Sequence, residues 1–159
     1  MSERDPSLYR PCVGVMLVNP EGRAFVGKRI DNKEGDFWQM PQGGIDKGEE
    51  PWSTALRELE EETGIPPHLV ERVADCPERL KYDLPEELRG KLWGGKWAGQ
   101  DQDWYLCRFL GRDSDINIAT RHPEFREWKW IEPEQLPELI VPFKRDLYRQ
   151  LLREFADHL

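Results

Sequence analysis

One helix with clear ends constrains this chain more than any other feature. Pro51 suits the first helical position, because its missing backbone N–H would have no partner there. Gly64 suits the left-handed residue that ends a helix, and Pro66 prevents continuation. We therefore expect a helix over residues 51–63. The side chains at helical spacing that would form its buried stripe are Trp52, Ala55, Leu56, Leu59 and Thr63.

Strands are expected on both sides of this helix. The residues from Tyr9 to Val18 are almost continuously apolar, which is typical of a central strand covered on both faces. The turn signal Asn19-Pro20-Glu21-Gly22 separates this strand from a return strand. The further strands are expected at 23–29, at 37–40 before the Gly43-Gly44 pair, twice within 70–84, at 104–110 and at 125–131, with 85–102 irregular.

A second helix is expected at the end of the chain, from about Pro142 to His158. Its stripe would consist of Phe143, Leu147, Tyr148, Leu151, Leu152 and Phe155. Because strands precede, surround and follow one central helix, the pattern predicts a mixed α/β sandwich with helices on the faces of a mixed sheet. The 159 residues suffice for a single domain, which we assign to 9–159 after a polar, frayed start at 1–8.

Composition excludes several classes of protein. Charged residues make up 34% of the chain, but an aromatic content of 11% argues against disorder. The net charge of −8 disfavours electrostatic coating of nucleic acid, so no duplex DNA binding is expected. The longest apolar run is too short to cross a membrane and no apolar leader opens the chain, which favours a cytoplasmic protein. Three cysteines without a Cys-x-x-Cys pair predict neither a zinc site nor a disulfide framework, and Cys12 and Cys107 are expected in the core.

Three glutamates on the central helix point to metal chemistry. Glu58, Glu61 and Glu62 stand at i, i+3 and i+4, where like charges repel by roughly 0.2–0.5 kcal/mol per pair. They also lie towards the C-terminal end, where the helix dipole disfavours anions. Mg²⁺ or Mn²⁺ would turn this repulsion into binding, because these ions take carboxylate and phosphate oxygens. A solvated acidic face is the simpler interpretation of an isolated triplet, and only the surrounding residues decide against it.

These surrounding residues complete a longer pattern, Gly-x5-Glu-x7-Arg-Glu-U-x-Glu-Glu-x-Gly-U, in which U is aliphatic. The nine specified positions are all filled, by Gly43, Glu49, Arg57, Glu58, Leu59, Glu61, Glu62, Gly64 and Ile65. By this pattern the chain resembles the Nudix hydrolases. The resemblance implies a Nudix-type α/β/α sandwich and hydrolysis of a nucleoside diphosphate linked to another group.

The resemblance also implies roles within the pattern. Arg57 would pair with Glu49 and hold the loop–helix–loop in shape, and Gly43 would allow a tight turn. The implied ligands of divalent Mg²⁺ or Mn²⁺ are Glu58, Glu61 and Glu62. Glu124 would lie on a loop over the metals, as a general base or as a further ligand, although its type alone also fits an ordinary loop carboxylate. Glu61 or Glu62 are alternative bases.

Matches outside the pattern span about residues 9 to 155 and narrow the resemblance to one subgroup. They are Tyr9-Arg10-Pro11, Trp38 to Gly44, Pro123-Glu124-Phe125 with Trp128-Lys129-Trp130, and Phe143 to Tyr148. The subgroup contains the bacterial RNA pyrophosphohydrolases and similar dinucleoside polyphosphate hydrolases of bacteria and plants. It implies cleavage of a phosphoanhydride in a 5′-triphosphorylated RNA end, in a dinucleoside polyphosphate, or in both. We expect a monomer.

Substrate contacts follow partly from residue type and partly from the resemblance. The candidate phosphate donors are Lys28, Arg29, Arg79 and Lys81, although isolated surface cations usually contact only solvent. By resemblance, Tyr82 contacts phosphate and Phe143 stacks on the first base. Phe143 fits the buried stripe of the last helix as well. The residues that would contact the next nucleotide are Arg10, Val141 and Lys144.

Departures from the subgroup leave the choice of substrate open. Residues 31–37 form a longer loop than in enterobacterial RNA pyrophosphohydrolases, and residues 92–100 differ as well. Met40, Asp46 and Pro142 are more similar to dinucleoside polyphosphate hydrolases of plants and α-proteobacteria. Two other functions compete. A non-catalytic nucleotide-binding module is disfavoured because every glutamate of the pattern is present, and a hydrolase of small damaged nucleotides is disfavoured by the matches outside the pattern.

Overall fold

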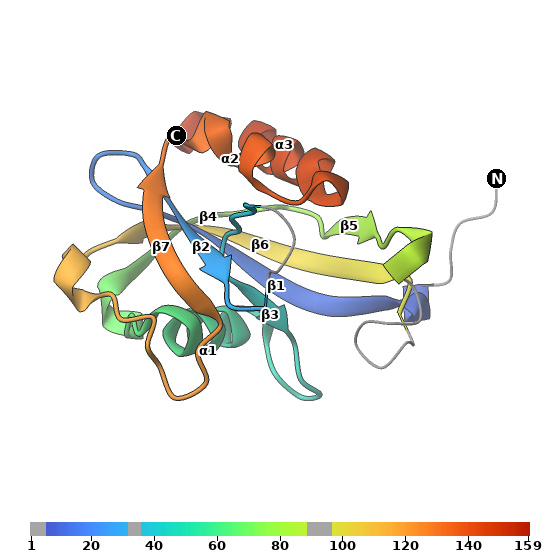
Figure 1. Ribbon diagram of the computed structural model, residues 1–159, viewed down its shortest axis with the longest axis horizontal. Helices are drawn as coiled ribbons and strands as arrows, with labels where there is room; N and C mark the ends of the chain where they lie inside the picture. The colour runs from blue at the N-terminus through green and yellow to red at the C-terminus, as the bar shows by residue number, and fades with distance from the viewer. Residues whose placement is uncertain (1–5, 32–35, 89–96) are drawn as a thin grey trace.

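The fold is a three-layer α/β/α sandwich, as expected (Figure 1). The computed structural model describes residues 6–31, 36–88 and 97–159. Within these ranges, no helix has the length and apolar character needed to cross a bilayer. The strands are β1 (Tyr9–Val18), β2 (Ala24–Arg29), β3 (Gln42–Gly44), β4 (Val70–Asp75), β5 (Leu80–Asp83), β6 (Gly99–Phe109) and β7 (Phe125–Ile131). The α-helices are α1 (Pro51–Thr63), α2 (Leu136–Leu139) and α3 (Arg145–Glu154).

Strand β1 lies at the centre of a mixed sheet with the order β4-β6-β1-β2-β7. It runs parallel to β6 along its whole length and antiparallel to its other neighbours. Its first half also pairs with β3, whereas its last residue, Val18, pairs with Ala24 of β2. The strand is buried from Cys12 onward, as the continuous apolar run predicts. This central position explains why β1 needs apolar residues on both faces.

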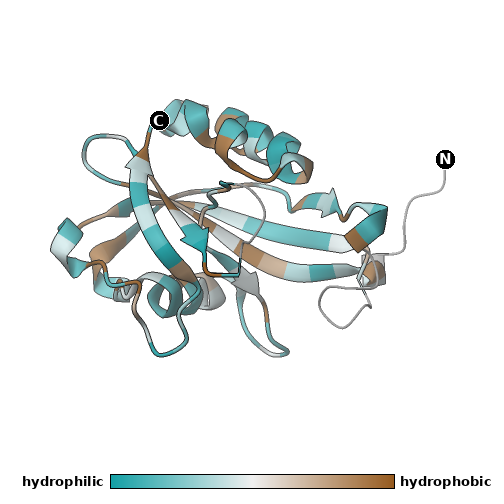
Figure 2. Ribbon diagram, in the orientation of Figure 1, coloured by the Kyte–Doolittle hydropathy of each residue, from teal (hydrophilic) through white to brown (hydrophobic). Residues whose placement is uncertain are grey.

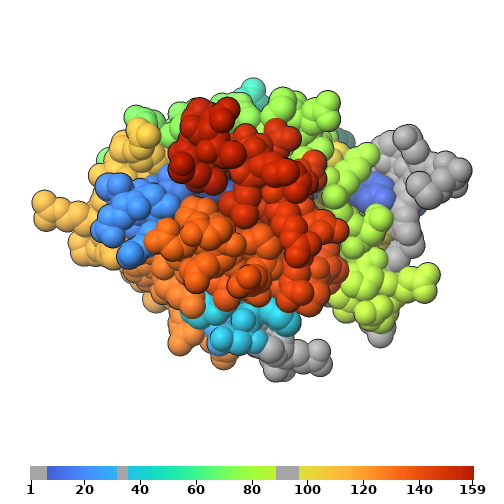
Figure 3. Space-filling model, turned by 90° about the horizontal axis from the view of Figure 1, so that it is seen from above, coloured from blue at the N-terminus to red at the C-terminus, as the bar shows by residue number. Residues whose placement is uncertain are grey.

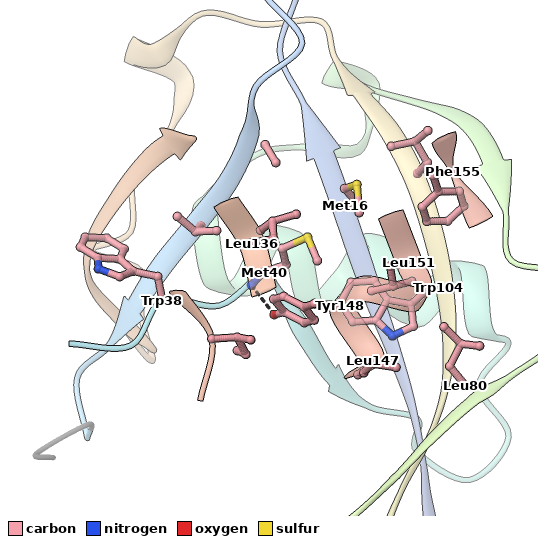
Figure 4. Close-up of a cluster of buried hydrophobic side chains, with 14 of the residues drawn as sticks. Met16, Trp38, Met40, Leu80, Trp104, Leu136, Leu147, Tyr148, Leu151 and Phe155 are labelled. Carbon is pink, nitrogen blue, oxygen red and sulfur yellow. Dashed lines mark hydrogen bonds between the residues drawn. The ribbon is translucent and has the colours of Figure 1, made fainter. Parts of the chain in front are cut away.

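Each face of the sheet has its own apolar core. On one face α1 packs against side chains that alternate along β1, namely Val13, Val15 and Leu17. On the other face α2 and α3 cover a second cluster, whose largest members include Trp104 and Tyr148 (Figure 4). Apolar residues line the strands between these layers (Figure 2), and the C-terminal segment covers the sheet when seen from above (Figure 3). The three free cysteines include Cys12 and Cys107, which are buried as expected.

Helix α1 has the predicted ends. Pro51 is its first residue, and Gly64 ends it with a φ of 74°, donating its N–H to the Glu60 carbonyl. The predicted buried stripe is only partly correct, because Trp52 and Leu56 are half-buried. Glu62 is buried instead, which places one carboxylate of the triplet inside the protein.

Several predicted elements were wrong in their bounds. The expected strand at 37–40 is only an isolated bridge between Gln39 and Gly27. Strand β3 covers Gln42–Gly44, although the sequence predicts that the Gly43-Gly44 pair lies after the end of a strand. Strand β6 begins at Gly99 within a stretch expected to be irregular.

The ends of the chain also differ from expectation. The last helix is divided into a 3-10 turn at Pro142–Lys144, α3 and a second turn at Ala156–His158. Helix α2 has four residues, too few for a periodic pattern to reveal it. Residues 6–8 form a 3-10 turn where a frayed start was expected.

Candidate active site

A cavity of 690 Å³ lies where β3, the end of β2 and the segment before α3 meet. This volume is typical of a small-ligand site. It is lined by Arg10, Arg29, Asp31, Phe37, Trp38, Gln39, Gln42, Gly43, Gly44, Glu58, Glu62, Tyr82, Leu84, Leu88, Gln100, Glu124, Ile140, Val141, Phe143 and Lys144. The cavity therefore brings together most of the residues that the sequence singled out.

Three carboxylates form the acidic end of the cavity. Glu62 is 3% exposed, its Oε2 has no hydrogen-bond partner, and burial raises its pKa well above the usual value. Burial also raises the pKa of Glu58 to about 7, against the opposing effect of Arg57. The negative charge of Glu124 raises the pKa of both. The carboxylate of Glu62 is buried and its Oε2 has no hydrogen-bond partner among the described residues, which is costly, so this part of the cavity favours a bound cation.

The role expected of Gly43 needs correction. Gly43 lies in strand β3 and does not form a tight turn. A Cβ atom at this position would lie 2.1 Å from Cδ of Glu58. The absence of a side chain therefore makes room for the Glu58 carboxylate, and any larger residue would displace it. Gly44 has a similar relation to Arg10, whose guanidinium would lie 2.5 Å from an added Cβ.

Arg57 organises the loop and helix next to the carboxylates. It donates hydrogen bonds from Nε and Nη2 to the carboxylate of Glu49, at 2.9 and 2.8 Å. Its Nη1 lies 3.1 Å from Oε1 of Glu58 and 3.1 Å from Oε2 of Glu61. Arg57 thus joins the loop before α1 to two members of the glutamate triplet.

Glu61 is the member of the triplet that does not line the cavity. Its side chain is 55% exposed and held by Arg57. In the part of the chain that the structure describes, no three histidine, cysteine or acidic side chains are arranged as a metal site. The spacing predicts that the three glutamates share one helix face, but of the three only Glu58 and Glu62 line the cavity.

The candidate phosphate donors are divided between the cavity and the surface. Arg29 lines the cavity, donates two hydrogen bonds to Asp31 at 2.8 and 2.9 Å, and lies 3.7 Å from Glu124. Lys28 is outside the lining, where it pairs with Asp36. The other two candidates outside the lining are Arg79, which pairs with Asp101 and Asp103, and Lys81, which lies over the ring of Tyr9.

A buried ammonium group also lines the cavity. Lys144 is 7% exposed, and within the described ranges it makes no ion pair with a carboxylate. Burial lowers its pKa to about 8, with a further lowering by Arg29. Its Nζ lies 5.1 Å from the ring centre of Tyr82, which in turn lies 5.9 Å from that of Phe143. Among the residues that the structure describes, the buried hydroxyl of Tyr82 has no hydrogen-bond partner. An anionic ligand would compensate both groups.

Sequence reasoning missed the glutamines of the cavity wall. Gln39, Gln42 and Gln100 all line it, and Nε2 of Gln39 is buried without a hydrogen-bond partner. The signal was the alternation of Gln100, Gln102 and Trp104, which places all three on one face of β6. The prediction that residues 85–102 are irregular does not take account of this alternation. The part of the 92–100 loop before Trp97 lies outside the described residues.

Comparison with known proteins identifies close relatives. The family model of the NUDIX domain matches residues 8–151. An RNA pyrophosphohydrolase from Novosphingobium aromaticivorans is 63% identical over 150 residues, which cover 94% of this chain and 93% of the relative. Another from Sphingopyxis alaskensis is 56% identical over 156 residues, covering 98% of each chain.

Solved structures share the fold at lower identity. A Caenorhabditis elegans Ap4A hydrolase in a binary complex has a TM-score of 0.67 and 22% identity, covering 93% of this chain and 98% of its own. An Escherichia coli dihydroneopterin triphosphate pyrophosphohydrolase has a TM-score of 0.70 and 21% identity, covering 92% and 98%. At these identities the likeness shows a common architecture.

Proposed function

Since this chain belongs to the Nudix hydrolase family, we propose that it is an RNA pyrophosphohydrolase, which removes pyrophosphate from 5′-triphosphorylated RNA ends. The observation that carries this proposal is the near full-length identity of 56–63% to relatives with that name. The cavity supports it, because the carboxylates and the buried ammonium that line it suit a metal-bound polyphosphate.

The carboxylates fit divalent Mg²⁺ or Mn²⁺. Glu58, Glu62 and Glu124 would hold the metal, and the unpartnered buried Oε2 of Glu62 is a ready ligand atom. Glu61 would join them only by leaving Arg57. When bound, the metal neutralises phosphate charge and lowers the pKa of attacking water. Glu124 lies at the rim, with 45% of its side chain exposed, where it would accept a proton or add a ligand.

The remaining groups would bind and orient the RNA end. Lys144 and Arg29 contribute positive charge to the wall, and the Tyr82 hydroxyl is a donor for a phosphate oxygen. Phe143 is half-buried at the cavity and would stack on the first base. Arg10 and Val141 also line the cavity, beside the position of the next nucleotide.

The proposal is tested with a short 5′-triphosphorylated RNA and, separately, with diadenosine tetraphosphate. Each is incubated with purified protein and Mg²⁺, then Mn²⁺, and the released phosphates are quantified. We expect faster cleavage of the RNA and no cleavage by Glu62→Gln, with the thermal melting of this variant showing an intact fold. Cleavage of the dinucleotide with inert RNA would make the protein a dinucleoside polyphosphate hydrolase. Binding of either substrate without cleavage would make it a non-catalytic module.

A further inference from the structure

A chain of hydrogen bonds runs from the apolar core to the cavity wall. Nε1 of Trp104 donates to Oε1 of Gln102 at 2.7 Å. Nε2 of Gln102 then donates to Oε1 of Gln100 at 2.7 Å and to Oε1 of Gln42 at 3.2 Å. Gln102 is fully buried, whereas Gln100 and Gln42 line the cavity. Two wall amides are thus connected to one indole in the core.

The indole of Trp104 determines which amide atoms donate and which accept in this series of hydrogen bonds. A tryptophan side chain can only donate, so the atom of Gln102 that faces Trp104 must be its oxygen. The nitrogen of Gln102 then faces the other two amides and uses its two hydrogens on their oxygens. Gln42 and Gln100 are left with Nε2 as the amide atom for a ligand. Both glutamine side chains therefore present N–H donors to the cavity.

The position of Trp104 depends on a residue without a side chain. Gly14 lies between Trp104 and Gln42 in the sheet, because it pairs with both. A Cβ atom on Gly14 would lie 2.4 Å from the six-membered part of the indole. On its other side, the indole meets Tyr148 edge-on, with ring centres 6.1 Å apart (Figure 4). The indole is therefore confined where its N–H reaches Gln102.

The two wall amides lie where phosphates would be expected. Gln42 directly precedes Gly43, the residue against the Glu58 carboxylate. The backbone of Gln42 also lies near the carboxyl group of Glu62, whose pKa it lowers. Gln100 pairs with Tyr82 across the sheet and with Arg10 on its other side. Gln42 thus lies beside the carboxylates, whereas Gln100 lies between Tyr82 and Arg10 in the sheet.

We propose that Trp104 and Gln102 are positioning residues that hold Gln42 and Gln100 as a pair of donors for oxygen atoms of the substrate's phosphate chain. This inference rests on the proposed function, because it assumes a polyphosphate in the cavity. Phosphate oxygens only accept hydrogen bonds at neutral pH, so donors bind them and amide oxygens repel them. If the side-chain amides of Gln42 and Gln100 could rotate freely, the cavity would no longer favour ligands that only accept hydrogen bonds.

The substitution Gln102→Glu reverses the direction of the hydrogen bonds to Gln42 and Gln100 with little change in side-chain shape. The carboxylate still accepts from Trp104 but offers no donor, so Gln42 and Gln100 turn their nitrogens inward and their oxygens to the cavity. With the 5′-triphosphorylated RNA we expect KM to rise at least tenfold while kcat stays within threefold. Trp104→Phe, which removes the N–H donor that orients Gln102, should raise KM in the same way. Trp130→Phe is the matched control, because it removes an indole hydrogen bond to Asp113 outside the cavity.

A binding readout separates this role from a purely structural one. Inorganic tripolyphosphate is added to the metal-free ¹⁵N-labelled protein, and the side-chain amide signals of Gln42 and Gln100 are followed by NMR. We expect both to shift in the wild type and in Trp130→Phe, and neither to shift in Gln102→Glu.

In the wild type, a shift of the Gly43 signal would report that tripolyphosphate has entered the cavity. If the side-chain amide signals of Gln42 and Gln100 then stay unshifted, the inference is overturned, even if a variant fails to fold. An unchanged KM in a folded Gln102→Glu would overturn it as well. Lack of RNA cleavage by the wild type would refute the proposed function instead, and the tripolyphosphate result would still report on the wall.

Discussion

The guanidinium of Arg57 donates two parallel hydrogen bonds to the carboxylate of Glu49, at 2.8 and 2.9 Å. Such a two-pronged contact needs the planar fork of arginine, and the single ammonium of lysine cannot reproduce it. Because a third nitrogen lies 3.1 Å from Glu58, the guanidinium fixes both the loop before α1 and a carboxylate of the cavity.

Arg57→Lys should therefore lower activity through position. By analogy with outer residues that orient metal ligands, we expect kcat to fall roughly 10–100-fold at saturating metal. Circular dichroism and melting temperature should show a folded protein. Arg149→Lys, which alters an exposed pair with Asp146 on α3, is the control and should leave kcat unchanged. Equal kcat in both variants would contradict an organising role for Arg57.

The buried carboxylates make the stability of the metal-free protein depend on pH. Burial raises the pKa of Glu58 from 4.5 to about 7, so the folded protein binds more protons than the unfolded chain between these values. Stability must then fall as pH rises through this window. The raised pKa of Glu62 acts in the same direction.

Thermal melting in a chelator should accordingly show a lower melting temperature at pH 8 than at pH 5.5. Saturating Mg²⁺ or Mn²⁺ at pH 8 should restore it, because the ion compensates the carboxylates. Glu58→Gln should flatten the dependence, while Glu127→Gln, an exposed residue of β7, should leave it unchanged. A melting temperature that rises with pH in the wild type would refute this reading of the cavity.

We expect the buried ammonium of Lys144 to lower the stability of the folded protein and to strengthen substrate binding. Its pKa of about 8 in the folded protein, against 10.5 for an ordinary lysine, means that the unfolded chain binds more protons between these values. Wild-type stability should therefore rise with pH from about 8 to 10.5 relative to Lys144→Met. At pH 7 the variant should melt at a higher temperature, because it no longer buries an unpaired charge.

The same variant should bind the RNA substrate less well. KM should rise roughly tenfold, which corresponds to the loss of about 1.4 kcal/mol of binding at the anionic group. Lys129→Met, which removes an exposed ammonium 4.2 Å from the ring centre of Trp38, serves as the control. If both variants keep the wild-type KM, Lys144 does not contact the substrate.

The helix α1 and its ends could be predicted because Pro51 and Gly64 act locally. Backbone restrictions at such residues hold in any tertiary setting. The continuous apolar run of β1 also predicted its element correctly. The cavity wall could not be predicted in this way. Gln42 and Gln100 are adjacent to the cavity only because β3 and β6 both pair with β1, which is a long-range relation.

Side-chain partners were also hidden from the sequence. Spacing places Glu61 on the face of Glu58 and Glu62, but it cannot show that Arg57 holds Glu61 away from the cavity. The resemblance implies a tight turn at Gly43, which is a role of the glycine backbone. Here Gly43 matters through the missing Cβ, which is visible only once α1 is packed against β3.

The two interpretations of Phe143, base stacking and core packing, can be separated by a matched pair of variants. Phe143 and Leu152 are both half-buried against the same apolar cluster, but only Phe143 lines the cavity. Phe143→Ala and Leu152→Ala should therefore lower the melting temperature to a similar degree. Only Phe143→Ala should raise KM for the RNA, by roughly 5–150-fold if a stacked base contributes about 1–3 kcal/mol.

A substrate without a base sharpens this comparison. Binding of inorganic tripolyphosphate should be unaffected by Phe143→Ala, because the phosphate contacts remain, and Phe143→Trp should retain RNA binding through its larger ring. Steady-state kinetics gives KM for the RNA, and calorimetry gives the affinity for tripolyphosphate. If Phe143→Ala and Leu152→Ala change KM for the RNA equally, Phe143 acts through packing against Tyr82 and the core, and base recognition must come from other residues of the cavity.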